Sequence, residues 1–217
     1  MKRSFLLMAA LCAAGLAAAT DLDVKIAYYS KVVTAEGVTR EARYEETMLR
    51  RAGHVWSARL LPAHAEEHKP GPHKHFNHVV LPRHVVLDNM QPRVEFIDGH
   101  AKEVVSVPRS EYDNIGFDGS WDHAYYLLDS KRLKAMPLSS RASSVPGARW
   151  REREDKGVFE RVLWDDRKQI PLVMESGDKA ATFFNRMELT VQPTLTRELP
   201  WQKLKGYAQK EYSDFLD

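Results

Sequence analysis

The chain has 217 residues, of which 43% are hydrophobic, enough to build the core of one domain of ordinary size. The formal net charge is +2, and Lys2 and Arg3 supply it, leaving 30 of the 32 basic residues against 30 acidic ones. This balance argues against a general nucleic-acid binder, which would carry a basic excess.

Residues 1–19 have the pattern of a secretory signal peptide. Lys2 and Arg3 precede an apolar run from Phe5 to Leu16, and Ala17–Ala19 offer small residues for cleavage. A buried N-terminal helix and a lipidated Cys12 are the alternatives. We expect cleavage before Thr20, export to the periplasm, and one domain over residues 20–217. The apolar run is too short to span a bilayer, so we expect no membrane-spanning segment after cleavage, although peripheral membrane association stays compatible.

Alternating apolar and polar residues predict strands through most of the remaining chain. The segment 38–49 also has helical propensity, but it alternates and lies between turn signals, so we favour a strand. The predicted strands before the middle of the chain are 23–33, 38–49, 54–61, 93–97 and 103–108, and a further strand begins at Ala148.

The stretch 159–193 contains three apolar runs of strand length, separated by polar turns at 165–169 and 176–179. Two consecutive antiparallel hairpins are therefore predicted, with Trp164 and Leu172 buried on facing strands. Pro171 has no N–H for a central ladder, so we expect it at an edge or a bulge. One face of this sheet is predicted to consist of Val162, Trp164, Leu172, Met174, Met187, Leu189 and Val191.

Two helices are expected. Residues 121–133 place apolar side chains roughly on one side, and residues 201–215 repeat apolar residues at three- and four-residue steps, as in an amphipathic helix. The C-terminal helix is expected to pack on the sheet, with docking of a partner as the alternative. The fold class is thus mainly β (α+β).

The hairpin carries a family resemblance. Val162-Leu163-Trp164-Asp165, then Ile170-Pro171-Leu172-Val173, then Met187 to Val191 resemble the exported LolA/LolB/RseB group. The resemblance implies an open antiparallel half-barrel, with a few helices covering its concave face. It also implies a non-catalytic protein that holds a hydrophobic ligand, such as a lipid or acyl group, or an envelope protein partner. The segment 62–84 departs from the family pattern.

That segment is rich in histidine, and we expect a long exposed loop there, with a short helix over 77–84 as one option. Imidazole is the commonest metal ligand in proteins and suits Zn, Cu and Ni, so metal binding or delivery is the alternative function. A pH-sensing loop and a plain solvated loop are the other interpretations. The candidate metal ligands are His64, His68, His73, His75, His78 and His84.

Tryptophans are the candidate ligand-binding residues under the carrier hypothesis, with simple core packing as the alternative. They are Trp56, Trp121, Trp150 and Trp164. Ser110, Ser120, Asp122 and His123 are residue types used in nucleophilic catalysis, but the Gly-x-Ser-x-Gly turn is absent from the sequence, so we predict no enzyme and no cofactor.

Overall fold

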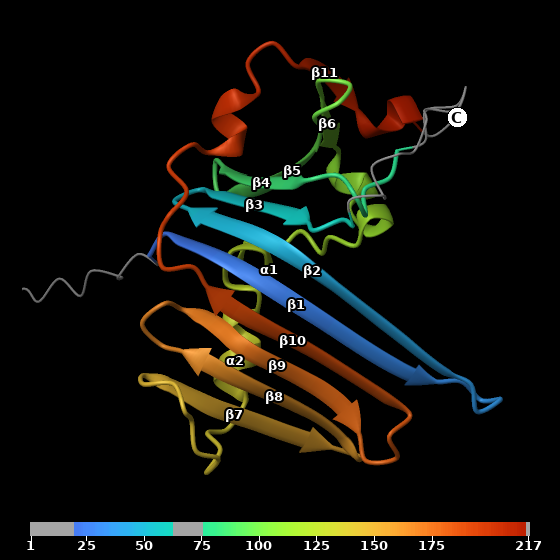
Figure 1. Cartoon of the computed structure of the whole chain (residues 1–217), viewed down its shortest axis with the longest axis vertical. Helices are drawn as coiled ribbons and strands as arrows, with labels where there is room; N and C mark the ends of the chain where they lie inside the picture. The colour runs from blue at the N-terminus through green and yellow to red at the C-terminus, as the bar shows by residue number, and fades with distance from the viewer. Residues whose placement is uncertain (1–19, 63–75, 216–217) are drawn as a thin grey trace, which may run out of the picture.

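The computed structural model describes residues 20–62 and 76–215. In this part of the chain eleven strands form one open sheet in the order β11-β6-β5-β4-β3-β2-β1-β10-β9-β8-β7 (Figure 1). Neighbouring strands are antiparallel, except that β11 runs parallel to β6. The strands are β1 (Leu22–Val33), β2 (Thr39–Arg51), β3 (His54–Arg59), β4 (Arg83–Asp88), β5 (Gln91–Asp98), β6 (Glu103–Val107), β7 (Ala148–Asp155), β8 (Val158–Asp165), β9 (Ile170–Asp178), β10 (Phe183–Val191) and β11 (Ala208–Glu211). The expected mainly β fold with an open, unclosed antiparallel sheet is confirmed.

The predicted order of two consecutive hairpins is confirmed, but the second turn lies later than the expected 176–179, because β9 runs to Asp178 and β10 begins at Phe183. β8, β9 and β10 are consecutive neighbours, and Val162 pairs with Met174, which pairs with Met187. The register shifts between Leu163 and Trp164, and Trp164 pairs with Pro171. The proline therefore lies at a bulge, as expected for a residue without a backbone N–H to donate. Trp164 and Leu172 are both buried.

One face of the sheet is covered by the segment between β6 and β7, which crosses behind the sheet in Figure 1. We call this the helix-side face and the opposite one the outer face. Even-numbered residues of β1 and β2 point to the helix-side face, and among them Ile26 and Met48 belong to the buried core. The crossing segment contains the 3-10 helices η1 (Arg109–Glu111) and η2 (Asp113–Ile115) and the α-helices α1 (Trp121–Tyr126) and α2 (Ser130–Ala135).

The single helix expected over 121–133 is two short ones. Leu127 has a φ of 60° and ends α1, and the Asp129 side chain caps α2 by accepting hydrogen bonds from the backbone N–H groups of Lys131 and Arg132. The local cap chemistry therefore outweighs the continuous apolar pattern.

The predicted C-terminal amphipathic helix is wrong. Residues 200–215 form the 3-10 helix η3 (Pro200–Lys203), strand β11 and the 3-10 helix η4 (Tyr212–Phe215). Gly206 has a φ of 88°, which interrupts any helix, and β11 instead pairs with the edge of β6.

The expected loop at 62–84 also ends earlier than predicted, and a helix over 77–84 is not formed. Residues 78–80 form a turn, and Arg83 and His84 begin β4. His84 is therefore a buried strand residue rather than part of an exposed loop. The proposed signal peptide at 1–19 lies outside the described residues, and no described helix is long and apolar enough to cross a membrane.

Candidate functional site

A cavity of about 290 Å³ lies on the helix-side face, between strands β1, β2 and β8–β10 and the α1–α2 segment. Its sheet wall includes Val162, Met174 and Met187, which are cross-strand neighbours. Its helix wall includes Leu128, which follows α1, and Met136, which follows α2. The cavity thus has apolar walls on two sides.

Apolar packing, a hydrogen bond and an ion pair hold the helix wall against the sheet. Leu128 and Met136 are buried in one cluster with Val162 and Trp164. Arg151 on β7 donates a hydrogen bond to the Met136 carbonyl oxygen at 2.7 Å. Arg132 on α2 forms an ion pair with Glu160 on β8. The sheet and the α1–α2 segment are therefore joined by apolar packing and by two polar links.

Polar groups line part of the cavity beside these links. Ser176 and Asn185 face each other across β9 and β10, and Glu160 lies across from Ser176 on β8. Burial opposes ionisation of Glu160, but hydrogen bonds and charge from Arg132 and Arg153 outweigh it and lower the pKa of this carboxyl. Glu160 is thus held as a carboxylate by its arginine partners.

Two stacked tyrosines mark the side of the cavity toward β2. Tyr28 on β1 and Tyr44 on β2 are direct cross-strand partners, and their ring centroids lie 4.5 Å apart. Burial, the nearby Glu46 charge and a hydrogen bond with Glu46 raise the pKa of Tyr28. Tyr28 therefore keeps its proton at neutral pH.

A second cavity, of about 200 Å³, lies beyond Tyr44 on the same face, over β2–β5. Tyr44 lines both cavities. Arg59 and Arg83 line the second one, with the Arg59 guanidinium 4.0 Å from the centre of the Tyr44 ring. The second cavity is accordingly more polar than the first.

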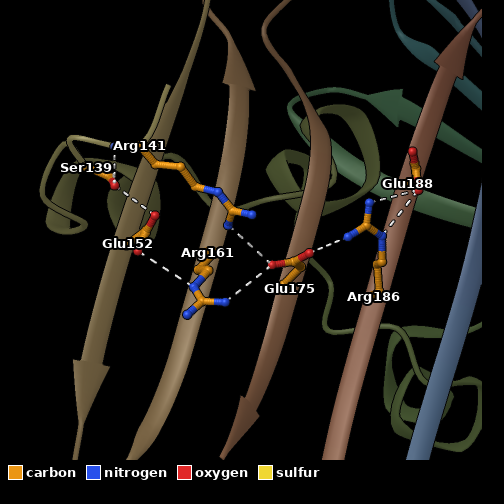
Figure 2. A network of polar contacts seen from close by, with 7 residues as sticks. All are labelled: Ser139, Arg141, Glu152, Arg161, Glu175, Arg186 and Glu188. Atoms are coloured by element: carbon orange, nitrogen blue, oxygen red, sulfur yellow. Dashed lines mark hydrogen bonds and ion pairs between the residues drawn. The ribbon is translucent and has the colours of Figure 1, made fainter. Parts of the chain in front are cut away.

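The outer face of β7–β10 carries a network of arginine and glutamate side chains (Figure 2). Glu175 is nearly buried, forms an ion pair with Arg186, and lies 3.7 Å from Arg161 and 3.8 Å from Arg141. Arg161 and Arg186 also contact Glu152 and Glu188, so the arginines here are matched by carboxylates. Since neighbouring residues of a strand point to opposite faces, Glu175 lies on the outer face while Met174 and Ser176 belong to the cavity side.

The four candidate tryptophans do not line either cavity. Trp164 is in the cluster behind Leu128 and Met136, and Trp121 stacks on Tyr125 with ring centroids 4.9 Å apart. Trp56 and Trp150 are buried side chains, and the guanidinium of Arg141 lies 4.4 Å from the centre of the Trp150 ring. Ligand binding by these residues stays a prediction.

The candidate metal ligands are only partly described. His64, His68, His73 and His75 lie outside the described residues. His84 lies on the outer face, with Nε2 3.1 Å from Nδ1 of His54, whereas His78 lines the second cavity on the helix-side face. Among described residues, no group of three or more histidine, cysteine or acidic side chains is placed to hold a metal ion. Metal binding by the six histidines stays a prediction.

The hydrolase-type residues have local structural roles. The Ser120 side chain caps α1 by accepting a hydrogen bond from the His123 backbone N–H at 3.2 Å, and the His123 ring contacts Asp118. Sequence reasoning missed Tyr28, Tyr44, Arg59 and Arg83 as cavity residues. A usable signal was present, because Arg59 shares the alternation of the core residue Val55 and is thus a charged residue at an inward position.

The geometry is that of an open antiparallel sheet with a cavity under short helices, the architecture that the LolA/LolB/RseB resemblance implies. No family model matches the chain, and no curated protein matches it. Solved structures similar to it include PNGF-II, at 9% identity and a TM-score of 0.38, covering 89% of this chain and 33% of that one, so this chain spans about a third of that protein's length.

Two further solved structures are similar to this chain. One is the Pseudomonas aeruginosa MucA/MucB complex, at 12% identity and a TM-score of 0.38, covering 84% of this chain and 55% of that one. The other is a LolA superfamily protein from Nitrosomonas europaea, at 10% identity and a TM-score of 0.35, covering 84% of this chain and 88% of that one.

Proposed function

We propose that this protein is an exported, non-catalytic carrier that holds a hydrophobic ligand in the cavity between the sheet and the α1–α2 segment. The observation that carries the proposal is the pair of apolar walls, Val162, Met174 and Met187 on the sheet and Leu128 and Met136 on the opposite side. Methionine side chains are flexible and polarizable, so such walls adapt to chains of differing shape.

The size of the cavity favours a small occupant. At about 290 Å³ it lies near the lower end of the ~300–1,000 Å³ typical of small-molecule sites. An acyl chain fits this class better than a folded protein surface does. An apolar segment of an envelope protein is the other occupant that the fold resemblance suggests, and the experiment below distinguishes it.

The test is fluorescence titration of the purified protein with an apolar probe. Met174→Glu and Met187→Glu each place a charge in the apolar wall, and we expect at least a tenfold loss of probe affinity, because burying an unpaired carboxylate beside an apolar chain is costly. Met90→Glu is the matched control, because Met90 is 82% exposed and lies outside the cavity. Far-UV circular dichroism checks that all three variants fold.

Native mass spectrometry of protein from the export compartment identifies the occupant. A co-purifying lipid supports the proposal, and a bound peptide or an empty chain with no probe binding contradicts it.

The metal alternative is tested in parallel by calorimetric titration with zinc, copper or nickel. Metal binding that is lost when His73, His75 and His78 are replaced together, with no probe binding to either protein, would favour metal delivery instead.

A further inference from the structure

The second cavity adjoins the first at Tyr44, which lines both. In the sheet, Tyr44 and Glu46 follow each other on the helix-side face of β2, and Glu46 is the cross-strand partner of Arg59. Ser57, two residues before Arg59, is the partner of Arg83 on β4. Alternation and register thus bring two arginines to the same face, directly beyond the tyrosine pair.

These two guanidinium groups are not neutralised by ion pairs in the described part of the chain. Arg59 stacks on Tyr44, and the Nε–H of Arg83 is buried without a hydrogen-bond partner among the described residues. Against these two guanidinium groups the described lining contains one carboxylate, that of Glu46, whose charge also raises the pKa of Tyr28. A buried donor without an acceptor costs free energy, so an anionic oxygen placed beside the Arg83 Nε–H would be stabilised there.

We infer that the ligand is a single-chain amphiphile with an anionic head group. Its chain occupies the apolar cavity, and its carboxylate or phosphate head lies against Arg59 and Arg83 beyond Tyr44. Arginine is the side chain best suited to this contact, because its planar N–H groups match the two oxygens of a carboxylate or phosphate. The inference rests on the proposed carrier function and adds the chemistry of the head group.

The experiment compares probes that share a dodecyl chain and differ in the head. Dodecanoate and dodecyl phosphate are anionic, dodecanol is neutral, and dodecyltrimethylammonium is cationic. Affinities for the full chain are measured by displacement of the apolar fluorescent probe, below the micelle concentration of each compound. We expect the anionic probes to bind at least about tenfold more tightly than dodecanol, with dodecyltrimethylammonium weakest. The preference should shrink with added salt, because the contact is electrostatic.

Arg59→Met and Arg83→Met keep much of the side-chain volume and remove the charge. Each should abolish most of the preference for the anionic head while leaving dodecanol binding within about twofold. Arg43→Met is the matched control, since Arg43 is an exposed arginine on the same strand as Tyr44 and lines neither cavity. If Arg83→Met does not fold, Arg59→Gln and the salt dependence of the wild type carry the test.

The outcomes separate the two proposals. Equal binding of dodecanoate, dodecyl phosphate and dodecanol would overturn the anionic head group and leave the carrier function intact. Binding of none of the dodecyl compounds would overturn the carrier function itself. Displacement of bound dodecanoate by millimolar acetate or inorganic phosphate alone would show that the arginines form a free-anion site, which also contradicts the amphiphile. A difference between dodecanoate and dodecyl phosphate identifies which head the arginines prefer.

Discussion

Arg50 is the most deeply buried charged residue in the described chain, with no exposed side-chain surface. Its guanidinium donates hydrogen bonds to carbonyl oxygens of Thr20, Tyr125, Lys168 and Gln169. It thereby joins the start of β1, the end of α1 and the β8–β9 turn. Burial lowers its pKa from the ordinary arginine value, and the Tyr125 ring lies 5.0 Å below it.

Replacing Arg50 should therefore cost stability through the carbonyls that it leaves unpaired. We expect Arg50→Met to lower the free energy of unfolding by about 2–4 kcal/mol, and Arg50→Lys to recover only part of that loss, because an ammonium cannot reach several carbonyls with one planar group. Urea denaturation measures both. Arg43→Met, at a side chain that is 75% exposed, is the control and should change stability by less than about 0.5 kcal/mol. If the urea midpoint of Arg50→Met equals that of the wild type, these hydrogen bonds make no net contribution to stability.

Trp164 illustrates a core residue that was predictable from the sequence. It lies at the register shift opposite Pro171 and packs in the cluster behind the cavity. Trp164→Ala should lower the free energy of unfolding by about 3–5 kcal/mol, the usual cost of emptying a large aromatic site. Chemical denaturation checks this, with the exposed Met90→Ala as the control. Trp164 packs against the helix wall and does not line the cavity. If this variant binds the probe more weakly, the cause would therefore be loosening of the α1–α2 segment.

At the scale of secondary-structure elements, η3 covers the outer face of β3 and β4 with a single aromatic side chain, Trp201. The Trp201 ring stacks on His54 and His84, with centroid distances of 5.2 Å and 5.1 Å, and Trp56 lies beside it. His84 Nδ1 lies 3.4 Å from Glu95 Oε2, and Arg93 forms an ion pair with Glu95. Arg51, the cross-strand partner of His54, is paired with Asp23.

This arrangement should make the protein less stable in mild acid. Burial and the adjacent His84 lower the pKa of His54, so the unfolded chain takes up protons more readily than the folded chain below about pH 6.5. Stability should be highest above that pH and fall as the pH decreases toward the lowered pKa. Urea midpoints at pH 7.5 and 5.5 measure the fall, which His54→Phe should reduce. His100→Gln, at an exposed histidine, should leave it unchanged, and an equal fall in all three proteins would refute the assignment.

Long secondary-structure elements were easier to predict from the sequence than short ones. Strands of twelve and thirteen residues repeat their alternation often enough to be recognised, as β1 and β2 show. α1 and α2 have six residues each, less than two turns, so their caps decide their ends. The cavity was not predictable, because its walls come from β1, β2, β8–β10 and the α1–α2 segment, and their meeting depends on strand order and register.

At the scale of the whole molecule, the two edge strands of the sheet, β11 and β7, are each protected against pairing with another chain, in different ways. β11 is short, exposed and polar, with the sequence Ala-Gln-Lys-Glu, and β7 carries charged residues from Arg151 to Asp155. Short or charged edge strands resist pairing with a second chain. After β10 the chain passes over the outer face at η3, pairs at the edge as β11, and places Tyr212 of η4 in the core on the helix-side face, so it wraps around one end of the sheet.

This wrapping predicts unequal stability across the sheet. A chain ending at Arg197 keeps the hydrogen bond from the Thr196 N–H to Asp23 but loses η3, β11 and η4. Trp56 and His84 would lose their cover, and the edge of β6 would be open. Hydrogen exchange followed by mass spectrometry should therefore show faster exchange in β3–β6, while β8–β10, which these C-terminal elements do not pair with, keep their protection. A chain ending at Glu211, which keeps η3 and β11 and loses η4 and the residues after it, is the matched comparison. It should loosen β5 and β6 more than β3, because Tyr212 and Phe76 pack near Phe96. Uniform acceleration in all strands of the shorter chain would instead mean that the sheet unfolds as one cooperative unit.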